Sequence, residues 1–129
     1  MINKNKAFSS FSVGDLAKAK EFYSGILGLD VKEQENMGLM ADLGGTKLFI
    51  YPKENHEPAT FTVLNFPVDD IDKAVDELKS KGVEFEQYDY EPIKTDEKGI
   101  ARSAGAEGNP SMAWFKDPAG NILSLMQEK

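Results

Sequence analysis

Residues 13–19 read VGDLAKA, and residues 68–74 read VDDIDKA, so one pattern of apolar, acidic and basic positions occurs twice in this chain. A second pair of similar segments is MGLMADLGG at residues 37–45 and MAWFKDPAG at residues 112–120. Solenoid repeats are about 20–50 residues long and occur at least three times, which this repeat does not. The repeat therefore predicts two similar modules that share one core, with a cleft between them.

Hydrophobic periodicity predicts the same order of elements in both modules. In the first module, Asp15 is placed to cap a helix that runs to about Leu27, and Gly28 closes it. In the second module, Asp70 and Gly82 hold the corresponding places. Alternation and short apolar runs predict strands at residues 7–13, 29–34, 37–42, 47–51, 61–68, 83–87, 112–116 and 122–127. Each module is thus expected to be a strand, a helix and three further strands.

The modules, about residues 6–52 and 60–129, are expected to form a single domain over residues 1–129. They diverge over residues 88–111, a long connection that is rich in glycine and charge. A short strand near residues 99–103 is compatible with this connection. Long connections in compact domains often carry function, so this one is a candidate binding loop.

Composition excludes several classes of function. A net charge of −7 argues against binding to nucleic acid or to anionic membranes. The absence of cysteine excludes disulfides, thiolate metal sites and a cysteine nucleophile. The N-terminal sequence lacks an apolar signal core, and no apolar run approaches membrane-spanning length. A soluble cytoplasmic protein is expected.

Two motifs resemble the vicinal oxygen chelate superfamily, which contains glyoxalases, extradiol dioxygenases and bleomycin-resistance proteins. The first is VGDL at residues 13–16, followed by FY at 22–23 and ILGL at 26–29; the second is the turn FKDPAGN at 115–121. The resemblance covers about residues 7–127. It implies an α+β fold of tandem βαβββ modules, with curved mixed sheets around a cavity that is commonly completed by dimerisation.

Enzymes of this superfamily usually hold a divalent metal with His, Gln or Glu side chains, two from each module. The resemblance assigns these four places to Phe8, Phe49, Val63 and Ser124. Three of these side chains offer no lone pair, and Ser124 offers only a neutral hydroxyl. A catalytic divalent site needs about three nitrogen or oxygen ligands and an open position. We therefore expect neither a metal nor another cofactor.

Other polar residues have more than one possible role. His56, the only histidine, is either a metal ligand or general base, or an exposed loop residue, and we favour the exposed loop. Arg102 either clamps an anionic ligand at the cavity mouth, or it is a solvated loop charge or an ion-pair partner of Asp96 or Glu107, and we favour this second role. Residues 88–91, YDYE, would suit a cationic ligand, although a strand end entering a solvated loop explains them better.

We predict that the protein sequesters a small apolar or aromatic molecule in the inter-module cavity, as a homodimer and without catalytic residues. The expected ligand-binding residues are Phe8, Ser10, Phe49, Tyr51, Val63, Asn65, Arg102, Trp114 and Ser124. One alternative is that the aromatic side chains fill the barrel and leave no cavity. Another is a glyoxalase-like lyase or isomerase that uses a displaced metal or metal-free acid–base groups.

Overall fold

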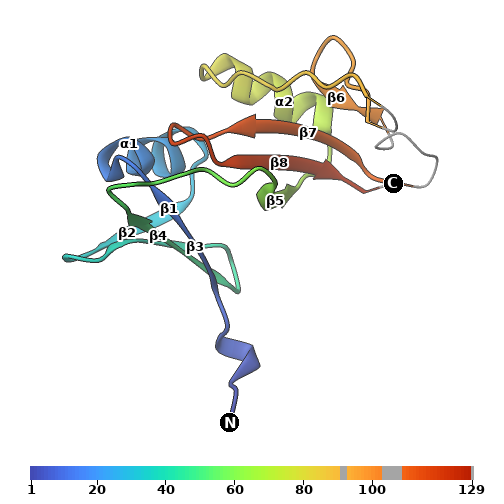
Figure 1. The fold of residues 1–129 in the computed structure, drawn as a ribbon. Coiled ribbons are helices and arrows are strands. Elements are labelled where there is room, and N and C mark those ends of the chain that lie inside the picture. The colour runs from blue at the N-terminus through green and yellow to red at the C-terminus, as the bar shows by residue number, and fades with distance from the viewer. Residues whose placement is uncertain (91–92, 103–108, 129) are drawn as a thin grey trace. The chain divides into compact units, whose positions relative to one another are not determined.

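The computed structural model describes residues 1–90, 93–102 and 109–128. The chain divides into two compact units, unit 1 at Met1–Pro58 and unit 2 at Ala59–Lys129 (Figure 1). In the described ranges, no helix is both long and apolar enough to cross a membrane.

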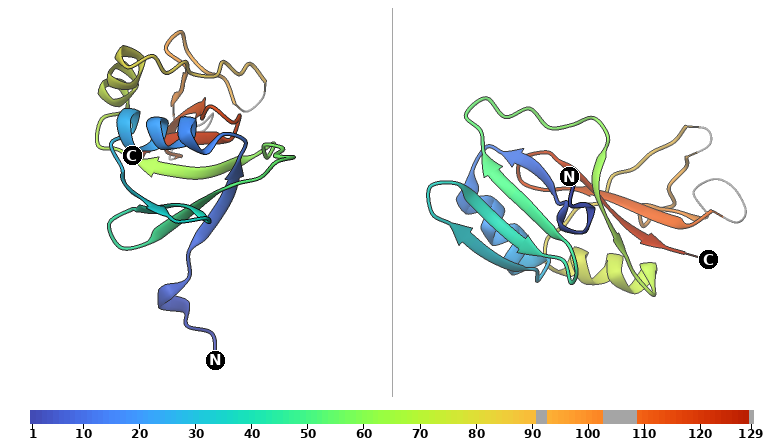
Figure 2. Two further views of the ribbon diagram at one scale, coloured as in Figure 1. Left: turned by 90° about the vertical axis from the view of Figure 1, so that its left-hand side faces the viewer. Right: turned by 90° about the horizontal axis from the view of Figure 1, so that it is seen from below.

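Unit 1 consists of one helical segment and a four-stranded mixed sheet. After a 3-10 turn at Lys4–Lys6, its elements are β1 (Ser9–Val13), α1 (Leu16–Lys20), the π-helical segment η2 (Glu21–Ile26), β2 (Asp30–Gln34), β3 (Gly38–Asp42) and β4 (Lys47–Pro52). The strand order is β1-β4-β3-β2, in which β1 and β4 are parallel and the other pairs are antiparallel. The right-hand panel of Figure 2 shows these strands in front of α1, so the helical segment lies on one side of the sheet.

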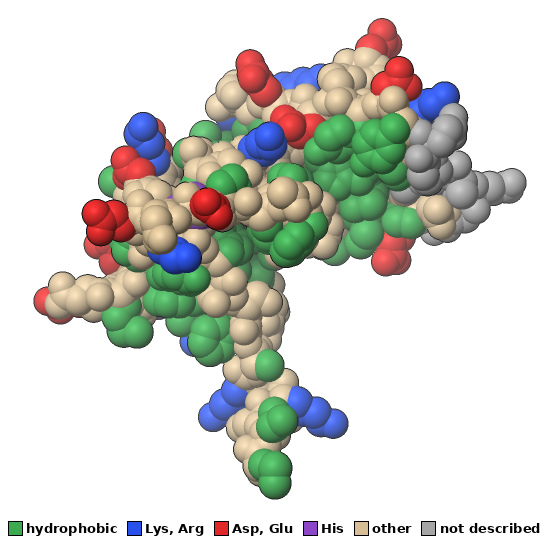
Figure 3. All heavy atoms as spheres, in the orientation of Figure 1, with side chains coloured by type: hydrophobic (Ala, Val, Ile, Leu, Met, Phe, Trp, Pro, Cys, Tyr) green, Lys and Arg blue, Asp and Glu red, His purple; other side chains and the backbone are tan. Residues whose placement is uncertain are grey.

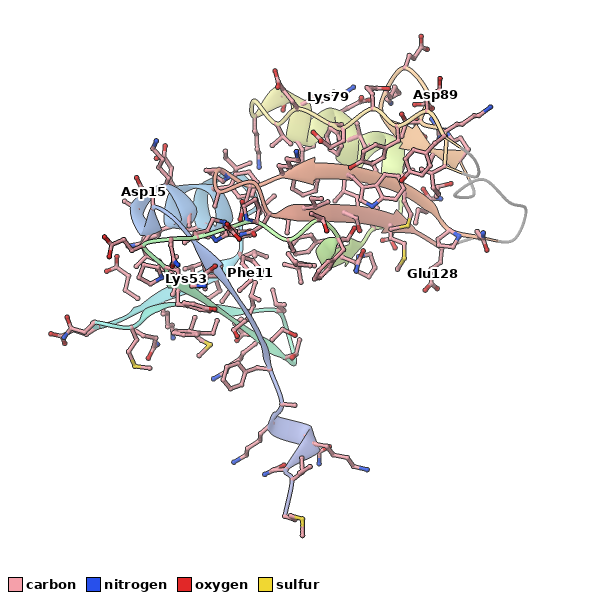
Figure 4. All side chains as sticks on the ribbon, viewed as in Figure 1. Phe11, Asp15, Lys53, Lys79, Asp89 and Glu128 are labelled. Carbon is pink, nitrogen blue, oxygen red and sulfur yellow. The ribbon has the colours of Figure 1, made fainter. Side chains whose placement is uncertain are left out.

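The first helix begins as the sequence predicts but changes its hydrogen bonding midway. The Asp15 carboxylate accepts a hydrogen bond from the Lys18 N–H at 3.1 Å, at the start of α1 (Figure 4). After Lys20 the segment is π-helical instead of α-helical to Leu27. The wider turn carries two consecutive core residues, Phe22 and Tyr23, which are both buried.

Unit 2 repeats this arrangement. Its elements are β5 (Thr62–Pro67), α2 (Ile71–Ser80), β6 (Ile100–Ala101), β7 (Ser111–Lys116) and β8 (Ile122–Gln127). The strand order β5-β8-β7-β6 places parallel and antiparallel pairs as in unit 1. Asp70 caps α2 by accepting from the Lys73 N–H at 3.1 Å, and Gly82 follows the helix with a φ of 94°. The two strand-helix-three-strand units confirm the predicted α+β fold.

The predicted strand at residues 83–87 is wrong. Only Phe85 forms a bridge there, opposite Phe115 of β7. The same edge of the sheet is then continued by β6, where Ile100 lies opposite Ala113. The edge strand is therefore interrupted by an insertion, and this is why its apolar pattern did not produce a continuous strand.

We call this insertion, residues 87–99, the excursion. It is ordered near its base by hydrogen bonds between Tyr88 and Thr95: the Thr95 N–H donates to the Tyr88 carbonyl, and the Tyr88 N–H donates to Thr95 Oγ1, both at 2.9 Å. It returns to the sheet at Gly99, which has a φ of 88° and where a Cβ would lie 2.8 Å from the Cβ of Phe85. Only glycine suits both this backbone conformation and this close approach.

The alignment of residues 37–45 with residues 112–120 and the pairing of the strands disagree by one residue in β7. The sequence aligns Asp42 with Asp117, but the last ladder pairs are Asp42 with Lys47 and Lys116 with Ile122. The second hairpin therefore holds one more residue in its turn. Because a shift of one residue moves a side chain to the other face of a sheet, this difference decides which residues face the candidate site.

Candidate functional site on the helix-free sheet faces

Each sheet has one face that packs into the core and a second face, which we call the helix-free face. In unit 1, the ring centroid of Phe11 lies 6.0 Å from that of Tyr23 in the helical segment. Ile50, which is paired with Phe11 in the sheet, is fully buried. The alternate residues lie on the helix-free face. They are Ser10, Ser12, Met40, Phe49 and Tyr51 in unit 1, and Asn65, Met112, Trp114 and Ser124 in unit 2.

The helix-free face of unit 1 carries an aromatic pair beside two hydroxyls. The rings of Phe49 and Tyr51 are stacked, with centroids 6.0 Å apart and an interplanar angle of 20°. In the parallel ladder, Ser10 lies opposite Phe49 and Ser12 lies opposite Tyr51. Both aromatic residues are half-buried. The structure thus brings together three of the predicted ligand-binding residues: Ser10, Phe49 and Tyr51.

Phe8 lies just before β1, and its side chain is 57% exposed. Together with Met40, Thr46 and Lys47, it lines an open depression of about 560 Å³ at one end of unit 1. Met40 is also the ladder neighbour of Phe49. The depression therefore adjoins the aromatic pair.

In unit 2, Asn65, Ser124 and Trp114 form one row across neighbouring strands. The Ser124 hydroxyl, which is fully buried, donates to Oδ1 of Asn65 at 2.5 Å. Val63, the remaining predicted residue on β5, is half-buried at an irregularity of the ladder between Thr62 and Leu64.

The excursion adds tyrosines to this row. The Tyr88 ring lies 5.3 Å from the Trp114 ring and 6.0 Å from the Tyr90 ring, measured between centroids. Burial, and then the charges of Glu86 and Tyr90, raise the pKa of the Tyr88 hydroxyl. Hydrophobic side chains gather on unit 2 near β6 in Figure 3. The sequence singled out these tyrosines, but the contact of Tyr88 with Trp114 depends on the interrupted edge strand.

Arg102 is not part of either helix-free face. Its guanidinium binds both carboxylate oxygens of Asp72 on α2, at 2.7 and 2.8 Å, and donates from Nε to Asp96 at 3.0 Å. Lys98 pairs with Asp72 at 3.0 Å and with Asp76 at 3.1 Å. We call these five residues the ion cluster. The Asp96 alternative is thus observed, whereas Glu107 lies outside the described residues.

The hydrogen bonds within the ion cluster shift the pKa values of its side chains. Hydrogen bonds from Arg102, and then from Lys98, hold the pKa of the Asp72 carboxyl well below its usual range. Burial acts to raise the pKa of Asp96, but backbone N–H groups and Arg102 outweigh it and lower that pKa. The hydrogen bonds to Asp72 also raise the pKa of Arg102 and of Lys98. Arg102 therefore fastens the end of the excursion to α2.

His56 is not the exposed loop residue that the sequence favoured. A turn in which the His56 N–H donates to the Lys53 carbonyl, at 3.1 Å, brings its ring back to β1. There Nδ1 lies 2.7 Å from the hydroxyl of Ser12, and both residues are half-buried. Sequence reasoning missed this pair because the two residues are far apart in the chain.

The four places at which the resemblance expects metal ligands do not fit a divalent metal. The side chains of Phe8, Phe49 and Val63 have no donor atom, and the Ser124 hydroxyl is engaged with Asn65. In the described part of the chain, no group of three or more His, Asp or Glu side chains could hold a metal ion.

Comparisons with known proteins agree with this architecture. The chain is 30% identical over 137 residues to the uncharacterized protein YurT of Bacillus subtilis (strain 168), covering 93% of this chain and 96% of YurT. TnmS3, an antibiotic binding protein from Streptomyces sp. CB03234, is 23% identical with a TM-score of 0.63, covering 95% of this chain and 96% of TnmS3. FosX, a fosfomycin resistance protein from Listeria monocytogenes, is 16% identical with a TM-score of 0.73, covering 100% of this chain and 94% of FosX.

These two structures show the same fold, and the sequence match identifies the family. Residues 8–125 match the sequence profile of the Glyoxalase/Bleomycin resistance protein/Dioxygenase superfamily, which covers nearly both units. The chain therefore belongs to this superfamily.

Proposed function

We propose that a helix-free face, in either unit, binds and sequesters a small, largely apolar or aromatic molecule. The observation that carries this proposal is the occupation of these faces by aromatic pairs, Phe49 with Tyr51 and Trp114 with Tyr88. The description of TnmS3 as an antibiotic binding protein supports it, because that protein shares the fold.

Apolar burial would supply most of the affinity. Removing about 100 Å² of apolar ligand and protein surface from water contributes about 2.5 kcal/mol. An offset-stacked or tilted aromatic pair adds about 0.5–1.5 kcal/mol beyond that area. Ser10 in unit 1, or Asn65 in unit 2, would then orient the polar atoms of a ligand on its own face, since pockets of this kind combine apolar walls with a few hydrogen-bonding groups. Arg102 is left out of this proposal, because the ion cluster uses its guanidinium.

The proposal includes no metal. The donor-free side chains of Phe8, Phe49 and Val63 support this part, because affinity for a divalent ion comes from nitrogen, oxygen or sulfur ligands.

The proposal also includes a two-fold homodimer, which light scattering after gel filtration tests directly. A mass of one chain at micromolar concentration contradicts the dimer and leaves ligand binding untouched.

Calorimetric titration with a panel of planar aromatic probes, such as naphthols, tests the binding proposal. We expect a micromolar to millimolar dissociation constant for at least one probe, and a loss of about tenfold in affinity for Phe49→Leu or Trp114→Leu. Met37→Ala is the matched control, since Met37 is apolar and 63% exposed but lies in the turn before β3. Equal affinity in all four proteins contradicts the assignment of the faces.

A second candidate function is a metal-free enzyme with its own acid–base group. The hydrogen bond between Ser12 and His56 on the helix-free face of unit 1 favours it. A hydroxyl beside an imidazole is a general arrangement for proton transfer, and it needs no metal.

A further inference from the structure

Ser12 and His56 form a hydroxyl–imidazole pair with the geometry of a nucleophile and its base. Ser12 Oγ lies 2.7 Å from His56 Nδ1, within the range of about 2.6–3.2 Å that such pairs show. In the tautomer with its proton on Nε2, the neutral imidazole accepts the serine O–H at Nδ1. The pair is half-buried, so small molecules can reach it while it remains partly shielded from water.

The fold ties both partners to β1. Ser12 lies within β1, one residue before the buried Val13, and is paired with Tyr51 of β4. His56 follows the end of β4, where the Lys53 N–H donates to the Val13 carbonyl at 3.0 Å. The turn that carries the imidazole is thus fastened to the strand that carries the hydroxyl. This fastening holds the imidazole within hydrogen-bonding distance of the hydroxyl.

We propose that Ser12 is a nucleophile that accepts acyl groups from activated aryl esters, with His56 as its general base. Ser12 Oγ forms a bond to the ester carbonyl carbon, and its proton passes to Nδ1 of His56. The bond to the aryl oxygen then breaks, and the leaving phenol takes the proton from His56, which leaves an acyl-serine. Water, activated by the same imidazole, releases the acid and restores the serine.

The neighbouring aromatic pair selects the ester class. Tyr51 lies opposite Ser12 in the ladder, and strands in a sheet are about 4.8 Å apart. Its ring is stacked with that of Phe49, so an aryl group placed on this pair would present its ester bond beside Ser12. The activity rests on access of small molecules to the helix-free face of unit 1, as the proposed binding function does.

p-Nitrophenyl acetate is the probe that tests this activity. We expect a burst of nitrophenolate from the native protein, and peptide mass spectrometry should place the acetyl group on Ser12. Ser12→Ala should abolish the burst, and His56→Gln should slow acylation by about 10²–10⁴-fold.

Ser9→Ala is the matched control, because Ser9 is an exposed hydroxyl on the same strand that lies opposite Leu48 and alternates to the other face, so it should leave the burst unchanged. Peptide mapping of the native protein gives the answer even if Ser12→Ala does not fold. An acetyl group only on lysines, or no burst at all, overturns the proposal. Binding of naphthol probes without acylation overturns only this activity, whereas the absence of both removes the binding function as well.

Discussion

Replacing Arg102 tests whether its side chain stabilises the fold through the ion cluster. Arg102→Ala removes two bonds to Asp72 and one to Asp96, all at 2.7–3.0 Å. The Arg102 side chain is 50% exposed and that of Asp72 is 44% exposed, so solvent screens the pairs. Exposed pairs contribute about 0.2–1 kcal/mol each, and bidentate geometry lies at the upper end. Because Lys98 still neutralises Asp72, the loss should be about 1–2 kcal/mol.

Differential scanning calorimetry measures this loss. Unfolding entropy of about 2.1 cal/mol/K per residue gives about 0.27 kcal/mol/K for the 129-residue chain, so Tm should fall by about 4–7 °C. Lys20→Ala is the control, since the Lys20–Glu33 pair at 3.3 Å lies on the surface outside the ion cluster and its loss should cost under about 2 °C. Equal Tm changes in the two variants, or no coupling in the double-mutant cycle of Arg102 with Asp72, would refute the reasoning.

The same cluster predicts a specific pH dependence. The pKa of Asp72 is lower in the folded chain than its unfolded value of about 3.9, so its ionised form stabilises the fold above that pH. This contribution should be lost as the pH falls from about 4 through the lower folded pKa. The difference in unfolding free energy between the native protein and Asp72→Asn should therefore be constant from pH 5 to 7 and shrink below about pH 4 in urea titrations. A difference that grows in acid contradicts the sign.

Two further substitutions test the turns that shape unit 2, each by urea denaturation. Gly99→Ala should cost about 2–3 kcal/mol, because the φ of 88° disfavours a side chain and the new Cβ would lie 2.8 Å from the Cβ of Phe85; Gly14→Ala, with open space around it, should cost under about 1 kcal/mol. Asp117→Ala should cost about 2–4 kcal/mol, since the buried carboxylate accepts from three N–H groups of its own turn at 2.9–3.0 Å. Asp42→Ala, where one exposed bond at 2.9 Å is lost in the equivalent turn, should cost about 0.5–1 kcal/mol. Equal costs for the two glycine variants contradict the argument from backbone conformation and close contact, and equal costs for the two aspartate variants contradict the argument from burial.

Local signals predicted most of the fold. Asp15 and Asp70 cap their helices because a carboxylate can satisfy a free N–H three residues later, and this depends only on neighbouring residues. Gly28 and Gly82 end those helices with positive φ angles, as glycine readily does. The failures occurred where structure depends on distant residues. The strand at residues 83–87 was wrong because pairing to β7 is shared with β6, on the far side of the excursion.

The candidate site was predictable in part. Alternation along β1 and β4 indicated a face carrying Ser10, Phe49 and Tyr51, which share one face in the structure. Alternation could not choose between Trp114 and its neighbour Phe115, and only the ladder shows which of them faces away from the core.

Two other contacts were beyond sequence reasoning. The bond between His56 and Ser12 depends on a turn that closes onto β1, and that of Arg102 with Asp72 depends on where the excursion ends. Neither partner is near the other in the chain, so residue type alone left several partners open.

Metal content of protein purified without chelator, measured by elemental analysis, tests the central claim most directly. Apolar side chains at Phe8, Phe49 and Val63 predict only substoichiometric traces of zinc, nickel, manganese or iron. One equivalent of such a metal per chain, retained on dialysis, would contradict a metal-free binding face.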